Sequence, residues 1–232
     1  MKSLRVICLF LLFVILSCDN NRIDNGEKDK KWTVVISDYN STCGIRGGDL
    51  YCWGGIDPED NKPELIQTGY KLTAIGYACD GIYGISGGEL FCMEGCCCEM
   101  SSDDCYSTYN FSNPINISND KKWQMISSDD NNICGISGGY LYCWGDNKYG
   151  QLGDGTTENK LVPTLIDTEP SWTSVSTNGE FTCGIKKGSV YCWGKNEFGQ
   201  LGNGTTDNEL IPARVGTDTD WASVSAGYAH AC

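Results

Sequence analysis

Short segments with a strand-like pattern recur along the chain from residue 31 onward. In one of them, alternation puts Trp172, Ser174 and Ser176 on one face and Thr173 and Val175 on the other. A period of two residues is typical of a β-strand, and the 3.6-residue spacing of an amphipathic helix is not found between these segments. The pattern predicts an all-β fold.

Each strand-like segment starts a unit that repeats at an almost constant interval. Successive units begin 40, 51, 49 and 49 residues apart, at Trp32, Leu72, Trp123, Trp172 and Trp221. A repeat of about 50 residues with several short strands fits one blade of a β-propeller. The predicted propeller region, 32–232, divides into repeats at 32–71, 72–122, 123–171 and 172–220 and a partial fifth at 221–232.

Three of the units contain a hairpin whose register follows from its turn. Between Cys134 and Cys143, the pair Gly138-Gly139 forms a two-residue turn, so counting outward places the two cysteines opposite each other. They fall at a non-hydrogen-bonded pair, where Cα atoms lie about 4.5 Å apart, and a disulfide accepts that separation. We therefore predict three disulfides, with buried free thiols as the alternative. The other two pairs are Cys43 with Cys52 and Cys183 with Cys192.

Side chains two positions apart in a strand share a face. In the hairpin of Cys183, the cysteines therefore share one face with aliphatic residues, and Tyr191 and Trp193 share the other. Gly184 lies opposite Tyr191 in this register. We expect the glycine to leave room for the tyrosine ring.

Two units continue after the hairpin with a glycine-rich motif. The first reads Trp-Gly-Asp-Asn-Lys-Tyr-Gly-Gln-Leu-Gly-Asp-Gly-Thr-Thr over 144–157, and the second keeps the same frame over 193–206. This motif resembles the repeats of the regulator of chromosome condensation family, in the form also called alpha-tubulin suppressor-like. The resemblance is specific over 123–232 and looser over 32–122, and it implies a β-propeller, usually of seven four-stranded blades. We expect the motif glycines, such as Gly150 and Gly153, to adopt left-handed or close-approach conformations.

The first two units depart from the motif. The first lacks Gly-Gln-Leu-Gly, and the second has Met93-Glu-Gly in place of Trp-Gly, followed by an acidic, cysteine-rich insert. Aligning Cys92 with Cys143 puts Tyr83 where the partner cysteine should be. For the six cysteines of this unit we expect disulfides, with a zinc or copper thiolate site or redox exchange as alternatives. They are Cys79, Cys92, Cys96, Cys97, Cys98 and Cys105.

Neither a metal site, nor a cofactor, nor a catalytic residue is predicted. Asp146, Asn147 and Asp154 superficially resemble a calcium loop, but ligands at alternate positions and a terminal glutamate are missing. The single histidine, His230, leaves little material for a Ser-His-Asp triad or a His-rich zinc site. The acidic neighbours of Cys96–Cys98 oppose the low thiol pKa that redox catalysis needs. We therefore expect a protein without enzymatic activity.

The N-terminus has the form of a signal peptide. Lys2 and Arg5 precede an apolar run, 6–16, that is too short to cross a bilayer. The sequence Ile-Leu-Ser-Cys at 15–18 then resembles the bacterial lipobox, which implies cleavage before Cys18 and attachment of lipid, palmitate included, to this cysteine. We predict a signal peptide at 1–17 and a lipidated polar tether at 18–31, with an ordinary secretory signal as the alternative. The predicted location is the bacterial cell envelope, lipid-anchored to a membrane and facing the periplasm or exterior.

The amino-acid composition restricts the classes of partner that the chain could bind. With 30 acidic and 17 basic residues, the net charge of −13 argues against nucleic acid. The 15 cysteines and 29 glycines indicate tight turns joined by disulfides in an oxidising compartment. Because propellers hold variable loops on a rigid frame, we expect the loops to bind a protein, peptide or glycan. The alternatives are a cysteine-cluster metal or redox protein and a purely structural envelope protein.

The last residue, Cys232, is expected to open a fifth hairpin whose second cysteine would lie nine residues on. Four repeats and the start of a fifth do not complete a seven-bladed ring. We therefore expect an incomplete propeller, either a fragment of a longer protein or an assembly of two chains.

Overall fold

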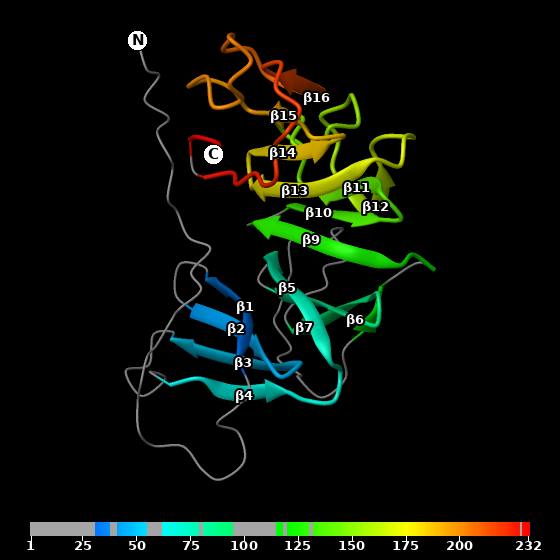
Figure 1. Ribbon diagram of the computed structural model, residues 1–232, viewed down its shortest axis with the longest axis vertical. Helices are drawn as coiled ribbons and strands as arrows, with labels where there is room; N and C mark the ends of the chain where they lie inside the picture. Colours follow the sequence, from blue (N-terminus) through cyan, green and yellow to red (C-terminus); the bar gives the residue numbers. More distant parts are fainter. Residues whose placement is uncertain are drawn as a thin grey trace.

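The computed structural model describes residues 31–37, 41–54, 62–78, 81–94, 115–117, 120–129, 132–227 and 229–232. Within these residues the fold is all β, as the sequence predicts. The strands form four antiparallel sheets of four strands each, and in every sheet the strands are adjacent in chain order (Figure 1). None of the described segments forms a helix that could span a membrane.

We call the sheets blades 1 to 4. Blade 1 contains β1 (Trp32–Ser37), β2 (Ser41–Arg46), β3 (Asp49–Gly54) and β4 (Glu64–Gln67). Blade 2 contains β5 (Leu72–Ala78), β6 (Gly81–Ser86), β7 (Glu89–Glu94) and β8 (Ile115–Asn116). Blade 3 contains β9 (Trp123–Asp129), β10 (Asn132–Ser137), β11 (Tyr140–Gly145) and β12 (Lys160–Leu165). Blade 4 contains β13 (Trp172–Asn178), β14 (Phe181–Lys186), β15 (Ser189–Gly194) and β16 (Glu209–Val215).

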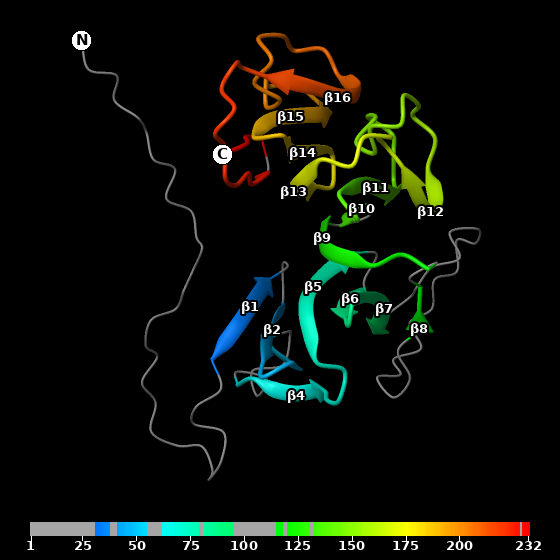
Figure 2. The same cartoon turned by 45° about the vertical axis from the view of Figure 1, so that its right-hand side comes forward.

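The blades follow one another around an arc, with their first strands toward its centre (Figure 2). Hydrogen bonds join β9 to β13, and β13 to the segment that follows blade 4. The hydroxyl of Ser127 in β9 accepts the backbone N–H of Thr177 in β13 at 3.0 Å. Ser176 in β13 accepts the N–H of Ala226 at the same distance. The contact between β9 and β13 thus recurs one sequence repeat later, between β13 and Ala226.

The hairpin registers agree with those expected from the turns. Cys134 pairs with Cys143, Cys183 with Cys192 and Cys43 with Cys52. In the turn of blade 4, Lys187 has φ 51° and Gly188 has φ 74°. Positive φ at both turn residues is the type I′ geometry that matches the twist of the flanking strands.

Each blade has two unlike faces. In blades 1, 3 and 4, the cystine face carries the paired cysteines and aliphatic side chains, and the tryptophan face carries the aromatic residues. The cystine face of blade 3, with Cys134 and Leu141, packs against the tryptophan face of blade 4, with Trp172 and Trp193. All four side chains are buried. The hydrophobic core therefore lies between blades rather than within one sheet.

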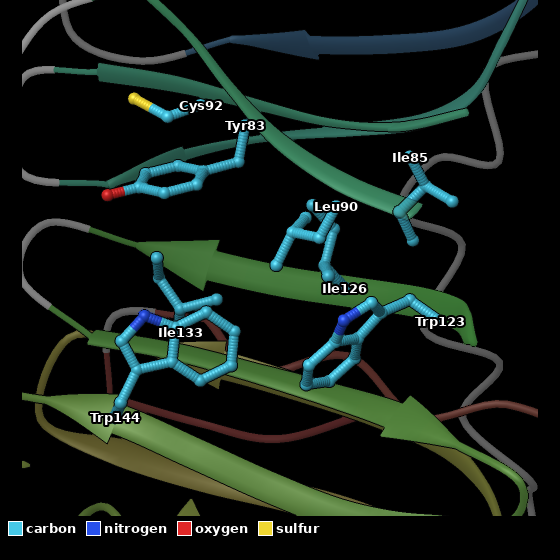
Figure 3. Packing of buried hydrophobic residues seen from close by; sticks show 8 residues of the cluster. All are labelled: Tyr83, Ile85, Leu90, Cys92, Trp123, Ile126, Ile133 and Trp144. Carbon is cyan, nitrogen blue, oxygen red and sulfur yellow. The ribbon is translucent and has the colours of Figure 1, made fainter. Parts of the chain in front are cut away.

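The same packing joins blades 2 and 3, where Tyr83 and Leu90 meet Trp123 and Trp144 between the two sheets (Figure 3). Tyr83 lies opposite Cys92, as the alignment expects. Between blades 1 and 2, Leu72 and Met93 replace tryptophans and are buried against the cystine face of blade 1. The rewritten second unit thus keeps an apolar interface with smaller side chains.

The face assignment from simple alternation is wrong at Trp172. The pairing of β13 with β14 skips Thr173, which forms a β-bulge between Trp172 and Ser174. A bulge reverses the side-chain direction beyond it, so Trp172 and Val175 both point to the interface with blade 3. The first strands of the other three blades show the same register shift.

The role of the hairpin glycine also differs from the expectation. A Cβ at Gly184 would lie 2.7 Å from the ring of Trp172, not against Tyr191. Equivalent contacts occur between Gly135 and Trp123 and between Gly44 and Trp32. The glycine therefore makes room for the tryptophan of the first strand, which lies across the sheet.

Residues 221–227 and 229–232 dock on blade 4 in the way that each blade docks on its predecessor. The N–H of Trp221 donates to Gly188 O at 3.1 Å, as that of Trp172 donates to Gly139 O at 3.0 Å. Backbone hydrogen bonds of 2.8 and 2.9 Å pair Ser225 with Cys232. Cys232 therefore lies opposite Ser225 as Cys183 lies opposite Ser176, which is the position expected for the first cysteine of a fifth hairpin.

Candidate functional site

Two long loops, 146–159 and 195–208, connect the third and fourth strands of blades 3 and 4, and we call them the loop platform. Each loop is organised around one fully buried asparagine, Asn147 or Asn196. The Asn147 Nδ2 donates to Asp154 Oδ1 at 3.1 Å and to Glu158 O at 3.0 Å, and its Oδ1 accepts the N–H of Leu152 at 3.0 Å. Asn196 makes the corresponding contacts with Asn203, Asp207 and Leu201. Loops without regular structure thus gain a fixed shape.

A buried glutamine fixes the aromatic residue of each loop. The N–H of Tyr149 donates to Gln151 Oε1 at 2.8 Å, and that of Phe198 donates to Gln200 Oε1 at 3.0 Å. Gln151 also donates to Gly179 O at 3.0 Å, in the connection between β13 and β14. The backbone that carries the two rings is therefore held by hydrogen bonds before any ligand arrives.

The platform loop of blade 3 extends across the blade interface. The N–H of Gly155 donates to Leu210 O at 2.9 Å, which ties the loop to β16. The carbonyl of Gln151 accepts hydrogen bonds from Thr182 at 2.8 Å and from the Trp193 indole at 2.9 Å. The glycines of the motif support this path, since Gly150 and Gly153 have φ of 81° and 80°, as expected.

The aromatic rings of the platform differ in their surroundings. The ammonium groups of Lys148 and Lys195 lie 5.0 and 4.8 Å from the centre of the Tyr149 ring, within cation–π range. A hydrogen bond to Glu180 raises the pKa of Lys195, with desolvation acting in the opposite direction. Phe198 has no such cover and is 72% exposed. An exposed phenyl ring on a backbone held in place is suited to contact with a partner.

Ion pairs fasten the platform and the linker between blades 3 and 4. Lys160 lies 3.2 Å from Asp154, and Lys186 lies 2.6 Å from Asp167. Desolvation acts to raise the pKa of Asp154, but hydrogen bonds from Thr156 and Lys160 outweigh it, so the pKa lies below its ordinary value. These carboxylates are charged structural groups rather than proton donors at neutral pH.

The residues considered for calcium do not form a cation site. Asn147 turns its Nδ2, a donor, toward Asp154, and Asp146 accepts a hydrogen bond from Asn159 at 2.9 Å. The described residues contain no group of three or more His, Cys, Asp or Glu placed to hold a metal ion.

The structure places six of the predicted site cysteines in three disulfides. Their Cα atoms lie 4.1 Å apart in each pair: Cys43–Cys52, Cys134–Cys143 and Cys183–Cys192. Cys92 is also disulfide-bonded. The other cysteines considered for lipidation or for the cluster lie outside the described residues: Cys18, Cys79, Cys96, Cys97, Cys98 and Cys105.

Sequence reasoning treated the platform as a set of structural glycines and missed its polar and aromatic residues. A signal for them was present, because Asn147, Gln151 and Tyr149 each recur 49 residues later as Asn196, Gln200 and Phe198. The recurrence of a buried polar residue is informative, since burial without a hydrogen-bond partner is costly.

The motif regions match a known repeat. Residues 138–185 and 187–232 match the regulator of chromosome condensation (RCC1) repeat, and 172–200 match a second description of that repeat. The chain carries RCC1 repeats. The glycine, asparagine and glutamine positions of the platform all lie within these RCC1 matches. No curated protein sequence matches the chain significantly.

Solved structures of RCC1 type share the fold. The chain is similar to human WBSCR16, with 20% identity, a TM-score of 0.69, and coverage of 85% of this chain and 56% of that one. It is similar to Prp20p from Saccharomyces cerevisiae, with 14% identity, a TM-score of 0.67, and coverage of 83% and 52%. Prp20p is described with its binding to Gsp1p and histones. The chain spans about half the length of these structures, and the likeness establishes an RCC1-type propeller scaffold.

Proposed function

We propose that this chain is a non-catalytic propeller scaffold that binds a protein, peptide or glycan through its platform loops at the bacterial cell envelope. The observation that carries the proposal is Phe198, which is 72% exposed on a loop whose backbone is held by Gln200 and Asn196. Exposed aromatic side chains on a rigid frame give contact area at a low entropic cost. A yeast protein of this fold, Prp20p, binds protein partners, which supports a binding role for the scaffold.

The proposed partner is uncharged or carries positive charge. The chain has a net charge of −13, and Glu180 and Glu197 lie beside Lys195 in the platform. An acidic surface repels the phosphate backbone of nucleic acids. Protein, peptide and glycan ligands are compatible with an aromatic contact, because a phenyl ring offers dispersion and stacking without requiring charge.

Binding is tested with the full-length lipidated chain in membranes, using fractionated envelope proteins and a glycan array. For the ligand that saturates, Phe198→Ala is expected to weaken affinity about tenfold or more, since a central aromatic contact contributes about 2 kcal/mol. The matched control is Ile211→Ala, which removes a 59% exposed apolar side chain from β16 of the same blade. The control should stay within about twofold of wild type.

The outcomes separate the alternatives. Unchanged affinity in Phe198→Ala would mean that the ligand does not use the platform, and equal losses in both variants would show that the effect is not specific to Phe198. The absence of any saturable ligand would favour a purely structural envelope protein.

We also propose that lipid on Cys18 holds the scaffold to a membrane. The apolar run at 6–16, the Ile-Leu-Ser-Cys sequence and the polar segment after it support this location. In a bacterial host fed with a palmitate analogue, the wild-type chain should be labelled and should fractionate with membranes. Cys18→Ala should lose both properties, whereas Ser17→Ala should keep them. Membrane fractionation of unlabelled Cys18→Ala would contradict the lipid anchor.

A further inference from the structure

The three described disulfides are not equally protected. In blades 3 and 4 all four cysteines are buried, with at most 1% of their surface exposed. In blade 1, Cys43 is completely buried, but Cys52 in β3 is only partly buried at the edge of its apolar cluster. In the blade 1 disulfide, Cys43 is therefore inaccessible to solvent and Cys52 is accessible.

The difference follows from the missing motif in the first unit. In blades 3 and 4, the leucine of Gly-Gln-Leu-Gly packs in the same cluster as the cystine, and these residues, Leu152 and Leu201, are at most 1% exposed. The first unit runs from Trp53 to Pro63 without this motif. It therefore lacks the leucine that shares a buried cluster with the cystine in blades 3 and 4.

The inner end of the same disulfide has a hydrogen-bond donor. The Tyr77 hydroxyl of blade 2 donates to Cys43 Sγ at 2.6 Å, and it lies 3.1 Å from Ser41 Oγ. In blades 3 and 4, the strand position of Tyr77 is occupied by Ser128 and Thr177. The Thr177 hydroxyl is occupied by contacts with Asn132 and Thr182. The tyrosine is a departure from the repeat, as is the missing leucine.

We propose that Cys43–Cys52 is a thiol-exchange site, whereas the disulfides of blades 3 and 4 are structural. The co-reactant is a thiol, either small or presented by a dithiol protein. Its thiolate attacks Cys52 Sγ, a new sulfur–sulfur bond forms there, and the Cys43–Cys52 bond breaks. The electron pair leaves on Cys43 as a thiolate, which accepts the Tyr77 hydrogen bond and then takes the proton released by the attacking thiol.

The direction of the reaction follows from access and from leaving-group stability. Exchange is faster when the attacked sulfur is accessible and when the leaving thiolate is stabilised. A hydroxyl that donates to the sulfur favours the thiolate form. Both conditions select Cys52 as the attacked sulfur and Cys43 as the leaving group. Exchange at this disulfide is independent of the ligand proposed above.

The site is tested by exposing the folded chain to glutathione at pH 8, followed by acid quenching, alkylation with iodoacetamide and peptide mass spectrometry. Glutathione is expected on Cys52 and the alkyl group on Cys43, while Cys134–Cys143 and Cys183–Cys192 remain intact at least about tenfold longer. Reaction of all three pairs at one rate, or glutathione on Cys43, would overturn the proposal.

The role of the tyrosine is tested with Tyr77→Phe, which removes only the hydroxyl. The rate of exchange at Cys52 should fall roughly three- to tenfold, because a hydrogen bond to a charged group is lost. The matched control, Tyr191→Phe in blade 4, should leave that rate unchanged. Thermal unfolding of both variants separates a kinetic effect from loss of structure, and an unchanged rate in a folded Tyr77→Phe protein would remove Tyr77 from the mechanism.

Discussion

Among single residues, the glycine of the second strand decides whether the tryptophan of the first strand can lie across the sheet. At Gly184 an added Cβ would lie 2.7 Å from the Trp172 ring and 3.1 Å from Ser174 O. Trp172 is 2% exposed and its ring lies 5.7 Å from that of Tyr191. Because the ring is confined between two blades, it cannot move away without opening the interface.

Gly184→Ala is therefore expected to lower the free energy of unfolding by about 1–3 kcal/mol through overpacking. Urea denaturation at pH 7 measures the loss. In a Trp172→Phe background the same substitution should cost less, since the smaller ring leaves space for the methyl group. Equal costs in both backgrounds would show that the strain comes from the backbone instead.

Charged residues at the linker between blades 3 and 4 make the free energy of unfolding depend on pH in the acidic range. Burial acts to raise the pKa of Asp167, but hydrogen bonds from Lys186 and from the Glu169 backbone lower it below its ordinary value. Glu169 also has a lowered pKa, through hydrogen bonds from Lys186 and Lys187. A carboxylate whose pKa is lower in the folded than in the unfolded state stabilises the fold at pH values above its unfolded-state pKa. This stabilisation is lost as the pH falls through its folded-state pKa.

The stability contributed by Asp167 should accordingly be present at pH 7 and disappear below about pH 4. We expect Asp167→Asn to be less stable than wild type at neutral pH, with the difference narrowing as the solution is acidified. Thermal unfolding between pH 7 and 3 measures this. Asp146→Asn, at an exposed hydrogen bond to Asn159, provides the comparison and should show a smaller change. A constant difference across this range would contradict the assignment.

At the scale of elements, the two platform loops have the same fold but different charges opposite the central asparagine. Asn147 faces Asp154, whereas Asn196 faces Asn203 at 3.3 Å. Asn147→Asp would replace a donor by a carboxylate that faces another carboxylate, and it should lower stability by about 1–3 kcal/mol. Asn196→Asp should cost less, because the side chain that it faces, Asn203, is neutral and adds no charge repulsion.

Urea denaturation of both variants at pH 7 and pH 4 tests this difference. The cost of Asn147→Asp should shrink at pH 4, where a carboxyl of the pair takes up a proton. Equal costs for the two variants at both pH values would mean that the shared backbone contacts, not the facing charge, dominate the loops.

The hairpin elements could be predicted from the sequence because their register depends on local turn residues. Gly138-Gly139 and Lys187-Gly188 determine which residues face each other, and the cysteine pairs follow. The bulge at Thr173 could not be found in this way. Its position is stabilised by burying Trp172 against the preceding blade, which is a contact between distant parts of the chain. The platform rings were missed for a related reason, as their exposure depends on how neighbouring blades are placed.

In the whole molecule, the described residues after Asp220 cover the cystine face of blade 4. Val224, Ala226 and Ala231 pack against the cluster that contains Phe181 and Leu201. Ending the chain after Asp220 should expose this cluster, lower the unfolding midpoint and increase the fluorescence of a hydrophobic dye such as ANS. Trp221→Ser is the control, since Trp221 is 46% exposed and its backbone contact to Gly188 can remain. A shortened chain with unchanged dye binding would show that this face does not need the segment.

In blades 1, 3 and 4 the two faces, one with cystine and one with tryptophan, also give the stack a polarity. Two cystine faces, or two tryptophan faces, do not fit together as a cystine face fits a tryptophan face. Blades therefore join in only one order and one orientation. Duplication of a segment of 49 residues would therefore insert a new sheet that already fits both its neighbours. Growth or loss of such repeats during evolution would change the curvature and the number of loops while keeping the junction chemistry seen between blades 3 and 4.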